Sequence, residues 1–110
     1  MLREIKESDW KLLRQLHSVA LERYCERVVS EIAQVSGDNA KGFHQRYLEI
    51  FTIVERRDKE IAQTFDDLRR STALVRIAAL HALGLLTSDE FSRFSDETRS
   101  IVAMFHERSA

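Results

Sequence analysis

Residues 43–83 read FHQRYLEIFTIVERRDKEIAQTFDDLRRSTALVRIAALHAL, and this stretch decides the fold. It contains neither proline nor glycine, the two residues that most often end a helix. Apolar residues occupy every seventh position, as in the buried stripe of a coiled coil: Tyr47, Val54, Ile61, Leu68, Val75 and Ala82. We therefore expect one long helix over residues 39–83. A break near residue 71 is the alternative, because the hydroxyl of Ser71 or Thr72 can cap a new helix.

The second stripe of this helix is only partly apolar. Its middle positions are Arg57, Thr64 and Ser71, while Phe51 and Phe65 widen the apolar face beside it. A face of this width suits packing among more than two helices. The unbroken helix would also extend about 60 Å, whereas a compact chain of this size has a radius of gyration of about 13 Å. We therefore expect a second subunit to cover an interface formed by Tyr47, Val54, Arg57, Ile61, Phe65, Leu68 and Val75.

Arg57 has two interpretations, because it lies in a run of alternating charges from Glu55 to Glu60. Runs of this kind are usually solvated helix faces. The alternative is that Arg57 pairs with an acid across the interface and fixes the register of the two chains, as buried polar residues do in coiled coils.

An earlier helix is expected over residues 8–36. Ser8 is a suitable N-cap, and the apolar residues that follow recur at three- and four-residue steps along one helix face. Gly37 is suited to end this helix, and Asp38 and Asn39 are typical turn residues. The chain should therefore reverse direction here and form a long antiparallel helical hairpin with the second helix.

The carboxy-terminal part, residues 87–107, is expected to form two short, capped helices. Gly84 can adopt the left-handed conformation that ends a helix, and Thr87 with Glu90 makes a capping box. Ser95 repeats the cap signal for a last helix. We therefore predict an all-α fold in one domain, residues 1–110, with a helical bundle completed by oligomerisation.

Residues 74–94 resemble the short carboxy-terminal domain called SHOCT. The resemblance rests on a leucine-rich helix followed by Gly84-Leu85-Leu86-Thr87, two polar residues and Glu90-Phe91. The sequence departs from that family after Phe91, where Ser92-Arg93-Phe94-Ser95 replaces a lysine-rich continuation. The resemblance implies a role in oligomerisation rather than in chemistry.

Composition narrows the choice of partners. The 17 basic and 18 acidic side chains nearly cancel, which gives no reason to expect a nucleic acid partner. No apolar run approaches the roughly 20 residues that span a bilayer, so no membrane association is expected. Cys25 is the only cysteine, and the amino-terminal residues have no secretory pattern, both of which favour the cytoplasm. Nothing in the sequence calls for a cofactor or a metal.

One enzymatic alternative comes from Arg76 and His81, whose spacing resembles the Arg-x4–6-His signature of the all-helical HEPN ribonucleases. The signature is short, and Arg99 with His106 matches it as well. Thirteen arginines make such matches expected by chance, so we assign no catalytic residues and expect no enzyme. The sequence instead favours a non-catalytic interaction or regulatory module that self-associates through amphipathic helices, as a homodimer or with a helical protein partner.

Overall fold

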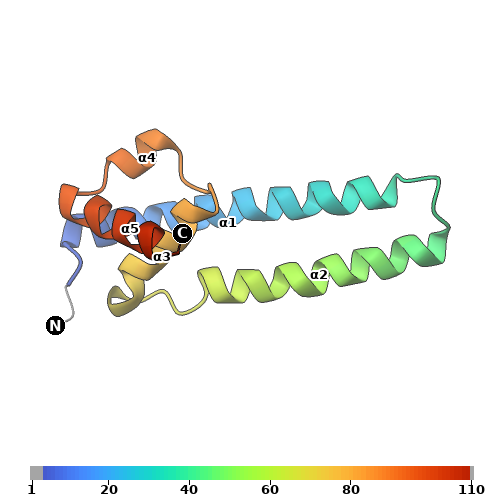
Figure 1. Cartoon of the computed structure of the whole chain (residues 1–110), viewed down its shortest axis with the longest axis horizontal. Helices are drawn as coiled ribbons and strands as arrows, with labels where there is room; N and C mark the ends of the chain where they lie inside the picture. Colours follow the sequence, from blue (N-terminus) through green and yellow to red (C-terminus); the bar gives the residue numbers. More distant parts are fainter. Residues whose placement is uncertain (1–3, 110) are drawn as a thin grey trace.

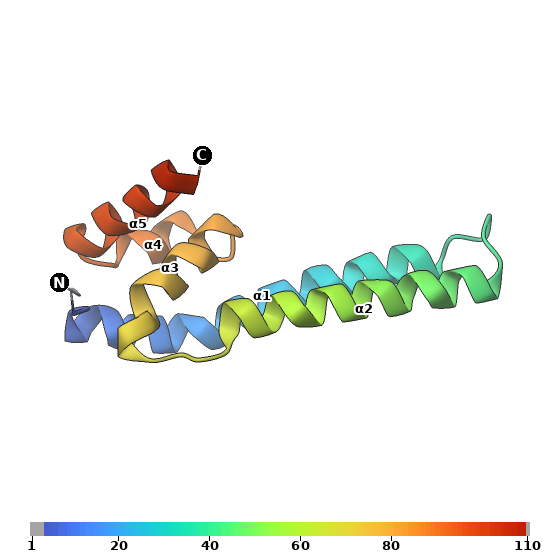
Figure 2. The same cartoon turned by 60° about the horizontal axis from the view of Figure 1, so that its bottom comes forward.

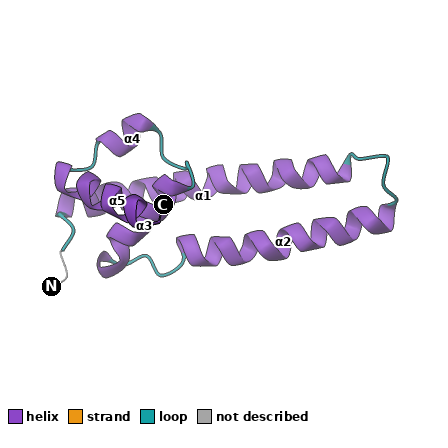
Figure 3. Cartoon of the chain, viewed as in Figure 1, coloured by secondary structure: helices purple, strands orange, loops and turns teal. Residues whose placement is uncertain are grey.

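The computed structural model describes residues 4–109, and every regular element within this range is helical (Figure 3). The elements in chain order are α1 (Glu7–Ser36), α2 (Phe43–Phe65), the 3-10 helix η1 (Arg70–Thr72), α3 (Ala73–Ala82), α4 (Ser88–Ser92) and α5 (Asp96–Ser109) (Figure 1). Helices make up 80% of the structure. The prediction of an all-α fold is confirmed.

α1 and α2 lie side by side and run in opposite directions, joined by residues 37–42 at the far end of the molecule (Figure 1). The turn begins at Gly37, whose N–H donates to the carbonyl of Ala33 at 2.9 Å. Asp38 then accepts a hydrogen bond from the N–H of Ala40 at 3.1 Å, an Asx-type turn. Gly37 therefore ends α1 through a backbone bond, and Asp38 shapes the turn through its side chain.

The expected helix over residues 39–83 is wrong, because α2 begins at Phe43 and ends at Phe65. The chain is interrupted before residue 71, since Asp67 adopts a left-handed conformation with φ 62° that a helix does not accept. The hydroxyl of Thr72 stabilises the new path by accepting from the N–H of Arg69 at 3.1 Å and donating to the carbonyl of Asp67 at 2.7 Å. The sevenfold apolar repeat therefore continues across a break in the helix.

The molecule is elongated, with extents of 54 × 26 × 25 Å and a radius of gyration of 16.9 Å, against about 13 Å for a compact chain of this length. We call residues 25–57, the far halves of α1 and α2 with their connection, the arm. The other described residues form the head. In the head α3, α4 and α5 pack on the near half of the hairpin (Figure 1).

The head contains the hydrophobic core, to which every α-helix except α4 contributes a buried side chain. Its buried members are Ile5, Leu12, Leu13, Leu16, Ala20, Tyr24, Phe65, Ala73, Ile77, Leu80, Leu85, Phe94 and Val102. α4 adds the partly buried Phe91, which packs against this cluster. The short helices after the Gly84 turn are therefore held by the same core as the near half of the hairpin.

Asp9, near the start of α1, fixes the beginning of α5. Its side chain is 2% exposed and accepts hydrogen bonds from the N–H of Ser95 at 2.9 Å, the hydroxyl of Ser95 at 2.6 Å and the hydroxyl of Thr98 at 2.7 Å. A buried carboxylate is tolerated only when its oxygens are bonded in this way. Ser95 caps α5 as predicted, since its hydroxyl accepts from the N–H of Thr98 at 3.3 Å, and Asp9 holds this cap from a distant helix.

Two arginines of α1 hold the turn between α3 and α4. Gly84 has φ 68°, the left-handed conformation expected of it, and this exposes the last carbonyls of α3. Arg27 donates to the carbonyls of Leu83 and Gly84 at 2.6 and 2.8 Å. Arg23 donates to the carbonyl of Leu85 at 2.8 Å. The positive side chains thus lie where the negative end of the helix dipole favours them.

The capping box of α4 is present as predicted, and it is connected to α1. Thr87 accepts from the N–H of Glu90 at 3.1 Å, and Glu90 accepts from the N–H of Thr87 at 2.9 Å. The same carboxylate pairs with Arg23 through two bonds of 2.6 and 2.9 Å. This bidentate hydrogen bond lowers the pKa of Glu90 to about 2. Glu90 therefore both starts α4 and fastens it to the hairpin.

All the helices of the head outside the hairpin lie on the same side of it. Figure 2 shows α3, α4 and α5 together on one side of α1 and α2, while the connection from α2 to α3 runs along the lower edge at the head end. Along the arm no other described helix covers the opposite side of the hairpin (Figure 1, Figure 2).

Candidate functional site

The predicted interface residues divide into two groups in the structure. Tyr47, Val54 and Val75 stay exposed, at 63%, 47% and 53%. Phe65 belongs to the core of the head, and Ile61 and Leu68 pack against it. Packing within the chain therefore accounts for part of the stripe that we expected a second subunit to cover.

Arg57, the seventh predicted interface residue, has partners in its own chain. Its guanidinium contacts Glu31 of α1 at 3.0 Å and Glu60 of α2 at 2.7 Å. Glu60 in turn accepts a hydrogen bond from the hydroxyl of Tyr24 at 2.5 Å. Burial and this bond raise the pKa of Tyr24 to about 12. The network joins α1 to α2, and the acids beside Arg57 belong to its own chain.

The enzymatic alternative gains no support from the arrangement of its two residues. Arg76 donates to the carbonyl of Gln63 at the end of α2. His81 bonds to His106 of α5, with 2.8 Å between Nδ1 and Nε2, and its ring stacks on Phe91 with 4.0 Å between centroids. Burial and the neighbouring imidazole lower the pKa of His81. Arg76 and His81 are therefore each engaged in separate packing contacts.

The described residues, 4–109, also contain no cluster of metal-ligating side chains, because no three His, Cys, Asp or Glu side chains in this range come together as metal ligands would. No helix of the described part is long and apolar enough to cross a membrane. Cys25 is a free, partly buried cysteine.

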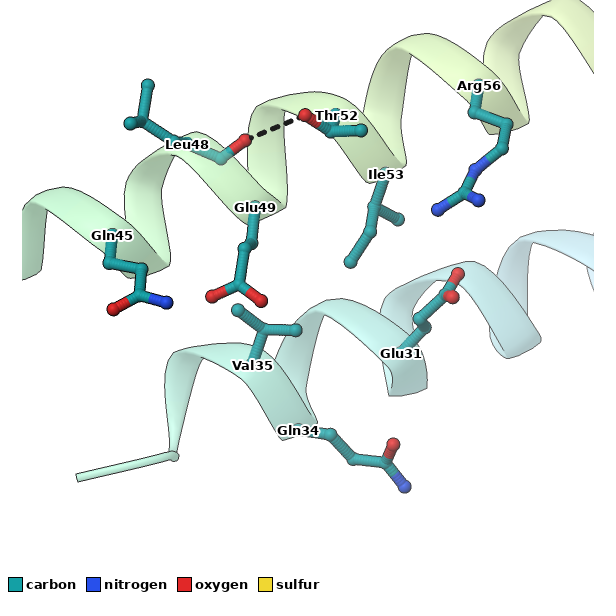
Figure 4. A pocket seen from close by; sticks show the side chains of 9 residues that line it. All are labelled: Glu31, Gln34, Val35, Gln45, Leu48, Glu49, Thr52, Ile53 and Arg56. Carbon is teal, nitrogen blue, oxygen red and sulfur yellow. Dashed lines mark hydrogen bonds between the residues drawn. The ribbon is translucent and has the colours of Figure 1, made fainter. Parts of the chain in front are cut away.

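A shallow groove of about 540 Å³ runs along one side of the arm (Figure 4). It is lined mainly by polar side chains: Glu31, Gln34, Gln45, Glu49, Thr52 and Arg56, with Val35, Leu48 and Ile53. Figure 4 shows Glu49 and Ile53 pointing from α2 toward α1. The groove lies on the same side as the head, because Gln34 follows Arg27 at a seven-residue step on α1. We call this the polar side of the arm.

The opposite side of the arm is apolar. Thr52 of the groove lies two residues from both Ile50 and Val54, and two residues correspond to about 200° around a helix. On α1 the same relation connects Gln34 with Ile32 and Glu31 with Val29. The residues that share this opposite side, which we call the apolar face, are Cys25, Val29 and Ile32 of α1 and Phe43, Tyr47, Ile50, Phe51 and Val54 of α2.

The apolar face is widely exposed. Its five most exposed members are Phe43 at 85%, Val29 at 65%, Tyr47 at 63%, Phe51 at 52% and Val54 at 47%. At typical side-chain areas these five alone present on the order of 600 Å² to solvent. That is at the upper end of roughly 300–600 Å², the size of the largest apolar patch on an ordinary monomer. The apolar face is the candidate functional site of this chain.

No known family model, curated protein or solved structure matches this chain. The resemblance of residues 74–94 to SHOCT therefore stays a prediction.

Sequence reasoning identified only part of the apolar face. Tyr47 and Val54 were predicted, and Phe51 was noted as widening the stripe. Phe43 and Ile50 were not among the predicted interface residues. Val29 was missed because it lies outside the three- and four-residue steps of the first helix. Only its position directly after another valine, Val28, could have drawn attention to it. The feature that identifies this surface is a group of aromatic residues, Phe43, Tyr47 and Phe51, spaced four residues apart along one helix face.

Proposed function

We propose that this chain is a non-catalytic protein–protein interaction module that docks through the apolar face of its arm. The observation that carries the proposal is the exposure of Phe43, Tyr47 and Phe51 on a side of the hairpin that no other helix covers (Figure 2). Large aromatic side chains are the usual anchors of protein interfaces, because they bury much area for little conformational entropy.

The charges beside the apolar face favour a protein partner over a lipid surface or a nucleic acid. Helices that bind anionic membranes carry Lys and Arg along the border of their apolar side. Here the borders carry acids, Glu22 on α1 and Glu55 and Asp58 on α2. Acids in these positions repel phosphate. A single, partly buried Cys25 suits the reducing cytoplasm, where we place the protein.

The SHOCT-like segment supports the head rather than the docking surface in this proposal. Residues 74–94 form α3 and α4, and Ile77, Leu80 and Leu85 are fully buried there. A partner could reach these side chains only by opening the head. The arm offers apolar area without such a cost.

Photo-crosslinking with neighbouring positions tests this function. Benzoylphenylalanine replaces Phe51 on the apolar face in one variant and Thr52, its exposed neighbour on the polar side, in the other. Irradiation of living cells that make the full chain should give one discrete adduct from position 51 and none from position 52. Adding Tyr47→Glu to the first variant should abolish that adduct. Equal adducts from both positions, or none from either, would contradict the proposal.

A further inference from the structure

We infer that the occupant of the apolar face is a second copy of this chain, packed face to face and in the opposite direction, so that two arms form a four-helix bundle. This inference rests on the proposed function, because it names the partner of the same surface.

The shape of the molecule fits a second copy. The apolar face belongs to a flat pair of helices, and its best complement is another flat pair with the same apolar width, as in four-helix bundles. The head of each copy lies on the far side of its own hairpin (Figure 2), so both heads point away from the contact. Two copies can therefore approach along their whole arms without obstruction.

The area is also sufficient. The five most exposed side chains supply on the order of 600 Å² per copy, and a stable interface needs about 800 Å² per partner. Cys25, Ile32 and Ile50, which are all partly exposed, add to this area, as do the polar side chains at its border. A two-fold contact uses the same patch twice, so no further surface is required.

Two contacts show which residues of α1 lie beside which residues of α2. Tyr24 bonds to Glu60, and Arg46 donates to the carbonyl of Ser36 at 2.7 Å. At this pairing Glu22, on the border of α1, lies about one turn from the level of Asp58, on the border of α2. The two acids are on opposite edges of the same face.

This alignment of α1 with α2 distinguishes the two ways of placing the second copy. If both heads lie at the same end, α1 of one copy lies beside α2 of the other, and Glu22 approaches Asp58 of the second copy. Like charges in that position repel. If the heads lie at opposite ends, α1 packs on α1 and α2 on α2, and these acids are kept apart. The charge pattern therefore selects the second arrangement.

The second arrangement also gives Asp58 a favourable neighbour. The two-fold axis passes near Phe51, the middle of the exposed stripe of α2. Asp58 and His44 each lie seven residues, or two helical turns, from Phe51. Antiparallel packing about Phe51 consequently brings Asp58 of one copy to His44 of the other. Phe43 at the tip is covered by the partly exposed Ile61 region of the second copy.

Light scattering on the purified chain tests the identity of the partner. The expected mass is twice the 12.8 kDa of one chain. Tyr47→Glu should give the single-chain mass with unchanged helical circular dichroism, while Gln45→Glu on the polar side should leave the doubled mass intact. A monomer at every concentration would overturn the inference, whether the apolar face then binds another protein or a lipid vesicle. The photo-crosslink from position 51 would still appear if only the inference, and not the proposed function, were wrong.

Disulfide formation between mixed variants tests the direction. In a Cys25→Ser background, chains carrying His44→Cys and chains carrying Asp58→Cys should cross-link on mild oxidation when mixed. Chains carrying Glu22→Cys mixed with the same Asp58→Cys chains should not. The reverse pattern would show that both heads lie at the same end, and would overturn the antiparallel arrangement while leaving the second copy in place.

Discussion

The head and the arm share the same two helices, yet their apolar residues are buried in the head and mostly exposed in the arm. In the head the stripes of α1 and α2 are covered by α3 and α5, and thirteen hydrophobic residues are buried in one cluster. In the arm the described residues bury only Ile53, while aromatic residues at the same helical spacing stay exposed. The difference shows that an amphipathic pattern marks a surface to be covered but does not say which chain covers it.

Truncating one side chain in each region should give the largest contrast. Leu80 is fully buried in the head, and Leu80→Ala should lower the free energy of unfolding by about 3 kcal/mol, because it removes apolar area and leaves a cavity. Tyr47→Ala in the arm should change it by less than about 0.5 kcal/mol when the chain is monomeric. Urea unfolding at low protein concentration measures both. A loss at Tyr47 equal to that at Leu80 would mean that the monomer itself covers the arm.

A second variant tests how strongly α5 depends on α1. Asp9→Ala should lower the free energy of unfolding by about 2 kcal/mol, since it leaves the N–H of Ser95 and the buried hydroxyl of Thr98 without their acceptor. Hydrogen exchange should show faster opening of α5 than of the arm. Asp89→Ala, an exposed acid of α4, serves as the control. A uniform rise in exchange over all helices would argue against a local role for Asp9.

The smallest expected effect is the loss of the Glu90 contribution to stability at low pH. The pKa of Glu90 is about 2 in the folded chain, below its ordinary value of 4.5, so its contribution is present above pH 4.5 and is lost as the pH falls toward 2. Glu90→Gln should cost about 1 kcal/mol at pH 7, because the pair with Arg23 is lost. Thermal unfolding at both pH values should show the difference shrinking toward pH 2. A difference independent of pH would mean that the cap, and not the charge, carries the contribution.

Local features of the fold could be predicted from sequence because they depend on neighbouring residues. Gly84 with its positive φ and the capping box of Thr87 and Glu90 are of this kind. The end of α2 at Phe65 was missed, since the apolar repeat continues past it and the left-handed conformation of Asp67 is only one of those that aspartate accepts.

Long-range pairings could not be read from the sequence. Asp9 and Ser95 lie 86 residues apart, and no local pattern connects them. Arg57 was assigned to a contact between chains, yet its acids are Glu31 and Glu60 of the same chain. A run of charges gives the type of partner but not its position. The candidate site was therefore only partly predicted, because exposure depends on where α3, α4 and α5 pack.

The bond between Asp9 and Ser95 also sets the order in which the chain acquires structure during synthesis. Contacts in the arm join residues close in sequence, such as Ser36 and Arg46, ten residues apart. They form soon after both helices are made, because short loops close at little entropic cost. Asp9 must wait until Ser95, 86 residues later, has left the ribosome. The head thus closes last, around a hairpin that is already formed.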